Sequence, residues 1–209
     1  LQEANKTLDQ QSKILSAAGL LDESSNVTEQ FKSIDARIVD LDTGLFDSSI
    51  KLEDYDEGSF SRNPSTSIEL SSEKDVALIK RRENFQTVYM HYEQDRLNAI
   101  ILPVRGYGLW GTMKGYLALE PDFQTIIGLE FFEHIETPGL GGEIVNPRWK
   151  AIWKGKEIFS ESGEDVFTIG FWGSGAGVSI FALELLITPC PSGKIPFNGS
   201  TGILGFCWS

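Results

Sequence analysis

A glycine-rich segment interrupts a long apolar stretch of the sequence, and it is the first place where the residue types suggest chemistry. Residues 134–149 read HIETPGLGGEIVNPRW, in which Pro138, Gly139, Gly141 and Gly142 fall within five positions. Glycine serves where the backbone needs a positive φ, or where another group must approach the main chain closely. The segment is therefore either an ordinary turn between a strand and a helix or a loop that lies against a flat ligand.

The elements on both sides of this segment favour a position at the edge of a sheet. Alternating apolar and polar residues around short turns predict two antiparallel hairpins, formed by residues 86–93 with 97–104 and by residues 114–120 with 125–134. After the segment, Asn146 followed by Pro147 is typical of a helix start. We expect this helix to present Trp149, Ile152 and Trp153 on one face and to end at Gly155. Its N-terminus would offer free N–H groups to an anionic or polar ligand.

The N-terminal part of the chain predicts helices followed by a strand. Apolar residues recur at three- and four-residue steps over residues 1–19, which predicts a helix that ends at Gly19. Capping-box spacing predicts a second, short helix over residues 26–34. Residues 36–46 alternate like a strand, with a turn at 42–44.

The next part of the sequence is polar. Residues 47–72 are acidic and rich in serine, which predicts a solvated surface loop. Residues 73–82 predict one or two helical turns. We interpret the basic trio Lys80, Arg81 and Arg82 as a solvated helix end, where positive charge complements the helix dipole.

These elements together predict an α+β fold, in which flanking helices cover an antiparallel sheet. We expect a helical segment at residues 1–35 and one α+β domain at residues 36–209. The sequence opens with Leu1 instead of methionine, which suggests a chain trimmed at its N-terminus.

The composition excludes several classes of protein. The apolar content of 41% is that of a chain with a core, and the net charge of −12 argues against a partner made of nucleic acid. No run of eighteen apolar residues is present, so no segment of this sequence is expected to span a membrane. Two cysteines, Cys190 and Cys207, and two histidines, His91 and His134, do not form a metal-binding pattern, so we expect no metal site.

Several long blocks of the sequence resemble one family. HIETPGLGGEIVNPRWKAIWKGKEIF is similar to a stretch of the C subunit of the bacterial sodium-translocating NADH:quinone oxidoreductase. The resemblance continues through QQSKILSAAGL, ARIVDLDTG, DVALIKRRENFQTVYM and ILPVRGYGLWGTMKGYLAL, and covers roughly residues 1 to 160 in family order. Long blocks in matching order are far more specific than one glycine loop.

The resemblance implies a flavoprotein subunit that is not catalytic alone. The family carries FMN bound covalently in an α+β domain of the FMN-binding type. That domain lies on the periplasmic side of the bacterial inner membrane and is anchored by one N-terminal helix, which this sequence would lack. The subunit passes electrons within a respiratory membrane complex that oxidises NADH, reduces ubiquinone and translocates sodium ions. Its partners are the other membrane subunits, and its contribution to the chemistry is to hold and tune the cofactor.

The resemblance also implies which residues contact the cofactor. The loop that lines the flavin in the family corresponds here to Glu136, Thr137, Pro138, Gly139, Leu140, Gly141 and Gly142. We expect the glycines to let the main chain lie near the ring, Glu136 and Thr137 to supply hydrogen bonds, and Leu140 an apolar contact. Trp110 either stacks on the ring or, as the simpler interpretation, belongs to the core.

Other polar residues have simpler interpretations. His134, beside the loop, either tunes the flavin or is a structural histidine with satisfied hydrogen bonds. The paired acids Asp54 with Asp56 and Glu130 with Glu133 are interpreted as solvated charges instead of catalytic carboxylates.

The C-terminal part departs from the family from about residue 166 onward. The family attaches FMN through a phosphoester to the threonine of a Ser-Gly-Ala-Thr motif, and the nearest string here is Ser174-Gly175-Ala176-Gly177. Glycine has no hydroxyl group, so the attachment residue is unknown. Residues 182–186 can be encoded by codons that, read in another frame, give Ser-Gly-Ala-Thr, which leads to the hypothesis of a frameshift or sequencing error near residue 165.

Two alternatives remain open from the sequence. One is the G subunit of the related ion-translocating electron-transport complex, which shares the flavin loop. The other is a structural or interaction module without flavin, which the missing acceptor threonine favours. The blocks QQSKILSAAGL and NPRWKAIWKGKEIF favour the C subunit of the quinone reductase over the G subunit of the related complex.

Overall fold

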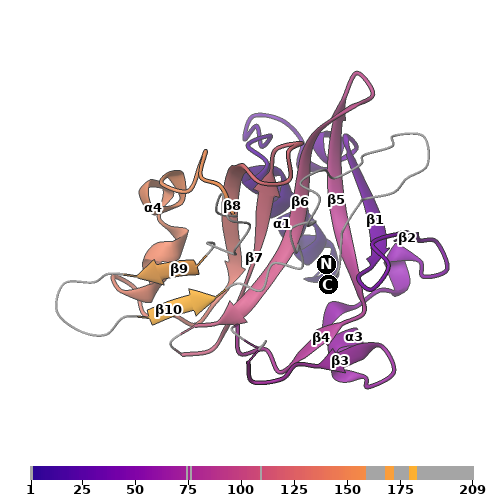
Figure 1. Cartoon of the computed structure of the whole chain (residues 1–209). Coiled ribbons are helices and arrows are strands. Elements are labelled where there is room, and N and C mark those ends of the chain that lie inside the picture. Colours follow the sequence, from indigo (N-terminus) through magenta and orange to yellow (C-terminus); the bar gives the residue numbers. More distant parts are fainter. Residues whose placement is uncertain are drawn as a thin grey trace.

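A six-stranded antiparallel sheet forms the centre of the molecule in the computed structural model (Figure 1). The structure describes residues 2–73, 75, 77–108, 110–158, 168–171 and 179–182. The strands of this sheet lie in the order β2-β1-β5-β6-β7-β8. Their bounds are β1 Ile34–Asp40, β2 Phe46–Asp47, β5 Phe85–Glu93, β6 Arg96–Tyr107, β7 Thr112–Leu119 and β8 Ile126–Glu133.

Helices and two smaller sheets surround the central sheet. The helices of the described residues are α1 Gln2–Ala17, α2 Val27–Phe31, α3 Glu57–Arg62 and α4 Pro147–Ala151, with 3₁₀ helices η1 Leu52–Asp54 and η2 Gly141–Val145. The small sheets pair β3 Ser67–Glu69 with β4 Arg81–Glu83, and β9 Thr168–Phe171 with β10 Ser179–Ala182. This arrangement confirms the α+β class. Within the described part of the chain, no helix is both long and apolar enough to cross a membrane.

The turns between the central strands form where the sequence predicted them. Gln94 and Asp95 both have positive φ, 50° and 60°, as a two-residue hairpin turn requires. In the next hairpin, the Asp122 carboxylate accepts hydrogen bonds from the main-chain N–H groups of Gln124 (2.9 Å) and Thr125 (2.8 Å). Local turn chemistry therefore fixes the order of β5 to β8.

The predicted helix ends are also present. Gly19 has φ +69° just beyond α1, and the N–H of Leu20 returns to the carbonyl of Leu15 at 2.9 Å. The Asn26 side chain accepts from the N–H of Thr28 at 2.9 Å and begins α2.

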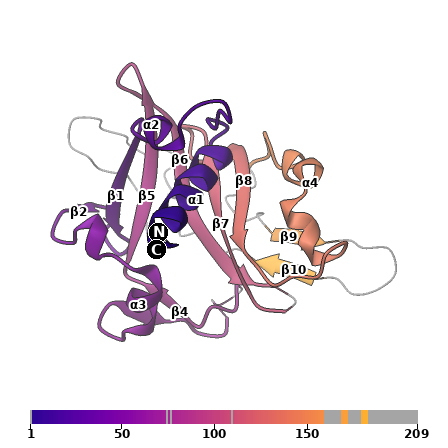
Figure 2. The same cartoon turned by 180° about the vertical axis from the view of Figure 1, so that it is seen from behind.

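The sheet separates two apolar clusters. On one face, Met90, Ile100 and Leu117 are fully buried beneath Ile144 of η2 and the partly buried Trp149 of α4. The other face is covered by α1, which crosses the back of the sheet in Figure 2. Burial on both faces explains why the central strands are nearly continuous apolar runs.

Helix α1 lies unusually close to strand β8. Ile14 and Leu15 are buried against Tyr116 and other residues of the sheet. A Cβ atom added to Gly128 would lie 2.4 Å from the main-chain oxygen of Ala17. Only glycine at this position lets the C-terminal turn of α1 rest on the strand.

A buried carboxylate also joins α1 and α4 to the sheet. Glu130 on β8 accepts hydrogen bonds from Lys150 Nζ (2.6 Å) and Ser16 Oγ (3.0 Å), and pairs with Lys13 at 3.5 Å. Only 5% of Glu130 is exposed, so its interpretation as a solvated charge was wrong. Glu133, near the end of the same strand, is exposed as expected.

The acidic segment at residues 47–72 is more ordered than the prediction of a loop. It contains β2, η1, α3 and β3. The Asp56 carboxylate accepts from the N–H of Ser59 at 2.8 Å and caps α3. The loop prediction failed because these elements are short and held by caps and by tertiary contacts, which hydrophobic periodicity does not detect.

The helical turns predicted at residues 73–82 are replaced by a turn and strand β4. The Asp75 carboxylate accepts from the N–H groups of Ile79 (2.7 Å) and Lys80 (2.8 Å), and Lys80 has φ +66°. Arg82 is buried and lies 3.5 Å from the Asp42 carboxylate. The interpretation of the basic trio as a helix end was therefore wrong, because residues 81 and 82 pair in a strand. Lys80 is exposed as expected, whereas Arg82 is drawn inward by β-pairing and its ion pair.

Candidate functional site

Two loops meet at the end of the sheet where β6 and β8 finish and β7 begins. The first loop comprises residues 108–111 and the second residues 134–146. The N–H of Trp110 donates to Glu136 Oε1 at 3.2 Å. A Cβ atom on Gly111 would lie 2.6 Å from Ile135 Cδ1, so the two loops pack directly against each other.

The second loop is folded onto itself. The carbonyl of Thr137 accepts from the N–H groups of Leu140 (3.1 Å) and Gly142 (2.9 Å). A Cβ atom on Gly141 would lie 2.4 Å from Glu136 Oε2, and one on Gly142 would lie 3.0 Å from the carbonyl oxygen of Thr137. The structural need for Gly141 and Gly142 is thus the loop's own packing, and not only close approach by a ligand as the sequence suggested.

Gly139 differs from these two glycines. It has φ +76°, and a Cβ atom built there would meet no atom within 4 Å. It is exposed beside Pro138 and Leu140. The outer side of the loop is therefore bare main chain, open to a ligand.

Large apolar side chains are exposed around this open side. Trp110 is 59% exposed, Ile135 66% and Leu140 56%. The interpretation of Trp110 as a core residue was therefore wrong. Single exposed apolar residues are common, but three of them on two touching loops make this side of the loops a candidate binding surface.

Two buried polar atoms in the second loop lack hydrogen-bond partners within the described part of the chain. Glu136 is 5% exposed, and its Oε2 atom has no hydrogen-bond partner among the described residues. The same holds for Nδ1 of His134. Buried polar atoms without partners are costly, so they indicate where an additional group completes the site.

The helix after the loop offers less than predicted. Asn146 accepts from the N–H of Arg148 at 3.0 Å, so part of the helix N-terminus is already paired. Helix α4 ends at Ala151, and Ile152 is 53% exposed, whereas Trp149 and Trp153 pack against the core. The predicted common face was therefore wrong for Ile152, which lies beyond the end of α4 with its side chain exposed.

A buried ionic cluster between α3, β4 and β6 was not detected from the sequence. Arg105 Nη1 donates to Glu57 Oε1 at 2.7 Å, and Arg105 Nη2 donates to Glu83 Oε2. Burial raises the pKa of Glu83 to about 7, although the Arg105 guanidinium opposes this shift. Burial also raises the pKa of the neighbouring Tyr55 hydroxyl. The members are far apart in sequence, and no local pattern joins them.

The predicted attachment region cannot be placed. Ser174-Gly175-Ala176-Gly177 lies outside the described residues, as do most of the residues covered by the frameshift hypothesis.

Comparison with known proteins covers both loops. A family model described as "FMN-binding domain" matches residues 108–180. The C subunit of the Na(+)-translocating NADH-quinone reductase from Vibrio parahaemolyticus is 40% identical over 182 residues, which cover 84% of this chain and 69% of that protein. The chain belongs to this C-subunit family. This confirms the predicted resemblance, and the relatives bear the name of the C subunit, which the sequence favoured over the G subunit of the related complex.

Other members of the C-subunit family agree. The Pseudomonas aeruginosa protein is 44% identical over 167 residues, covering 78% of this chain and 64% of that protein. This chain thus spans slightly less than two thirds of that relative. The crystal structure of Shewanella oneidensis NqrC matches with a TM-score of 0.70 and 37% identity, covering 77% of this chain and 75% of that one.

Proposed function

We propose that this chain is the FMN-carrying electron-transfer subunit of a sodium-translocating NADH:quinone reductase complex. The observation that carries the proposal is that the FMN-binding match begins at residue 108 and includes the two loops that the structure brings into contact. Its relatives bear the name of a component of such a complex.

The described loops fit a flavin on two grounds. A planar tricyclic ring needs a broad apolar surface, and exposed Trp110, Ile135 and Leu140 supply one. The ring also has a polar edge, and Glu136 Oε2 and His134 Nδ1 are polar atoms without partners among the described residues. When bound, FMN supplies one- and two-electron redox chemistry.

The chain's own residues would bind, orient and shield the cofactor. The indole of Trp110 offers an aromatic face, and Leu140 and Ile135 exclude water from it. The bare main chain at Gly139 permits close approach. The Trp110–Glu136 hydrogen bond holds both loops at a fixed separation, so the surface is formed before the cofactor binds.

We further propose the location and partners of this protein. The domain would lie on the periplasmic side of the inner membrane, anchored by a helix that precedes Leu1 in the complete protein. Its partners would be the other membrane subunits.

We also propose that the natural reading frame beyond residue 165 supplies the acceptor threonine. The DNA sequence of the gene tests this last point, because codons that cannot give Ser-Gly-Ala-Thr in a second frame would exclude it.

A charged substitution on the proposed flavin surface tests the site. Leu140→Asp, measured in the assembled complex, should lower the flavin midpoint potential by roughly tens of millivolts, because a nearby negative charge disfavours reduction. Leu45→Asp is the matched control, since Leu45 is 45% exposed in the turn between β1 and β2. If the flavin midpoint potential is the same in wild type and in both variants, the loop does not form part of the flavin site. A complex in which this chain holds no flavin would instead favour the flavin-free module.

A further inference from the structure

Helix α4 follows the glycine loop through η2, and little of it is buried. It has only five residues, Pro147–Ala151, and none of them is buried. Trp149 packs against the core but is only partly buried, and Ile144 of η2 is the nearest fully buried side chain before it. A helix of this length is not stable by itself, so its position depends on tertiary contacts. The contacts that hold α4 therefore also determine where the loop ends.

Hydrogen bonds run from α4 back to the loop. The N–H of Lys150 donates to the carbonyl of Asn146 at 3.0 Å, and the Asn146 side chain donates to Glu143 Oε2 at 2.7 Å. The N–H of Glu143 donates to the carbonyl of Leu140 at 3.1 Å, and the N–H of Leu140 donates to the carbonyl of Thr137 at 3.1 Å. The loop, η2 and α4 thus form one hydrogen-bonded unit.

The side chain of Lys150 ties this unit to the sheet. Its Nζ atom donates to Glu130 Oε2 at 2.6 Å, and the Lys150 side chain is 21% exposed. Glu130 belongs to β8 and is buried, so water screens this pair less than it screens a pair on the surface. Hydrogen bonds between charged groups are stronger than those between neutral groups. The Glu130–Lys150 pair therefore contributes to holding α4 against β8.

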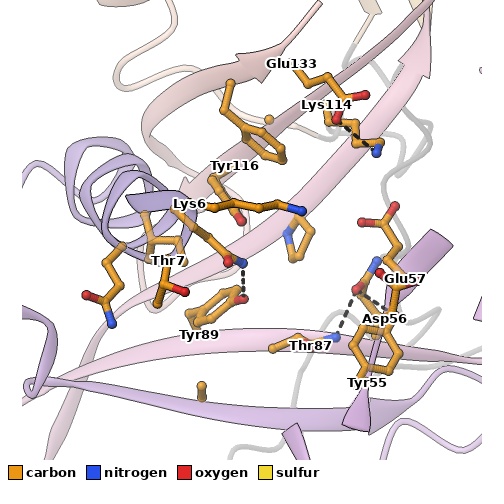
Figure 3. A pocket seen from close by; sticks show the side chains of 18 of the residues that line it. Lys6, Thr7, Tyr55, Asp56, Glu57, Thr87, Tyr89, Lys114, Tyr116 and Glu133 are labelled. Atoms are coloured by element: carbon orange, nitrogen blue, oxygen red, sulfur yellow. Dashed lines mark hydrogen bonds and ion pairs between the residues drawn. The ribbon is translucent and has the colours of Figure 1, made fainter. Parts of the chain in front are cut away.

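Two neighbouring ion pairs lack this connection to the loop. Lys13 approaches the same Glu130 carboxylate at 3.5 Å, but it belongs to α1. Glu133 pairs with Lys114 of β7 at 3.1 Å, and both line a cavity of about 750 Å³ that lies below α1 (Figure 3). Of these three lysines, only Lys150 lies on α4. The neighbouring pairs are therefore natural controls for the role of Lys150.

We propose that Glu130 and Lys150 are positioning residues for the glycine loop. Their ion pair holds α4 against β8, and α4 holds the loop at residues 136–142 in the conformation that exposes Gly139 and Leu140. When the pair is lost, the loop and α4 open together more often. The consequence for the flavin rests on the proposed function, whereas the conformation of the loop does not.

Hydrogen exchange of the Gly142 and Glu143 amides in the whole chain measures the opening of the loop. Lys150→Met should accelerate exchange at both amides about tenfold, because a hydrogen bond between charged groups is lost. Lys150→Arg keeps the charge and the donors, so it should restore slow exchange. Lys13→Met removes a cation from the same carboxylate but not from α4, and should leave both rates unchanged.

The flavin midpoint potential in the assembled complex gives a second readout. Lys150→Met should shift this potential more than Lys13→Met, because both variants remove one positive charge beside Glu130 but only the first releases the loop. Methionine keeps the aliphatic stem of the partly exposed Lys150, so the substitution is not expected to prevent folding. A circular dichroism spectrum that matches wild type confirms this before the exchange measurement.

Two results would overturn the positioning role. They are exchange at Gly142 and Glu143 that Lys150→Met leaves unchanged, and exchange that Lys13→Met accelerates as much as Lys150→Met does. Either result in a chain that carries FMN would refute the positioning role alone. A chain without FMN in the complex would refute the proposed function, and the exchange rates would still decide whether the pair positions the loop.

Discussion

Gly128→Ala tests whether the close contact of α1 with β8 is required for stability. The added Cβ atom would lie 2.4 Å from the main-chain oxygen of Ala17, about 1 Å less than an ordinary contact. Because that oxygen belongs to the helix backbone, α1 must move away from the sheet as a unit. The displacement would loosen the packing of Ile14 and Leu15, which are 1% and 0% exposed.

The expected loss follows from two opposing effects. Overpacking of this kind costs about 1–3 kcal/mol. Replacing a strand glycine by alanine recovers about 0.5–1 kcal/mol, since the unfolded chain loses conformational freedom. We therefore expect a net loss of about 1–2 kcal/mol in the free energy of unfolding, which lowers Tm by roughly 2–8 °C in a chain of this size.

Urea unfolding followed by circular dichroism measures this loss. Gly58→Ala is the matched control, because the nearest atom to its Cβ would be Nη1 at the flexible end of Arg62, at 3.3 Å, and Asp56 Oδ1 would lie at an ordinary contact distance of 3.7 Å. Alanine in helix α3 should stabilise the protein by at most about 1 kcal/mol. If Gly128→Ala proves as stable as wild type, the close packing of α1 on β8 is not what holds the helix in place.

Three further substitutions test other contacts. Burial raises the pKa of Glu83 to about 7 from 4.5, so its contribution to stability is complete below pH 4.5 and falls by about 3 kcal/mol as the pH rises to 7. Glu83→Gln should remove this pH dependence of the unfolding free energy, measured by urea titrations at several pH values. An unchanged pH dependence would contradict the assignment. Glu130→Ala removes the buried acceptor that pairs with the partly exposed Lys13 and Lys150, and should cost about 2 kcal/mol in unfolding free energy. The exposed control Glu133→Ala should cost less than about 1 kcal/mol, and equal losses would refute the role of Glu130. Gly141→Ala displaces the Glu136 carboxylate, which accepts a hydrogen bond from the N–H of Trp110. Exchange of the Trp110 amide hydrogen should therefore accelerate, while global stability changes little. Unaltered exchange would argue against the contact.

The central fold was predictable because its signals are local. Alternating residues, the Gln94–Asp95 turn and the Asn26 cap each act over a few positions, and the structure contains all three. Residues 47–83 were predicted poorly because their short elements depend on distant partners. Arg82 is an example, since its buried ion pair with Asp42 cannot be inferred from a run of basic residues.

The candidate site was predictable only in part, for a similar reason. Glycine spacing identified the loop at residues 136–142, but the purpose of each glycine depends on tertiary neighbours. Gly141 accommodates the loop's own Glu136, whereas Gly139 faces open space. The contact between Trp110 and Glu136 joins residues 26 positions apart, and no local pattern predicts it. The cavity below α1 was missed because it forms between segments that are distant in sequence.

The most direct test of the central claim is flavin analysis of this protein within its natural complex. The complex is purified from cells that express the complete gene, its subunits are separated, and FMN is quantified per copy of this chain before and after NADH is added. The account predicts about one FMN per chain, with absorption bands that bleach on reduction by NADH. A chain that contains no FMN, or FMN that does not bleach while the rest of the complex is reduced, would contradict it.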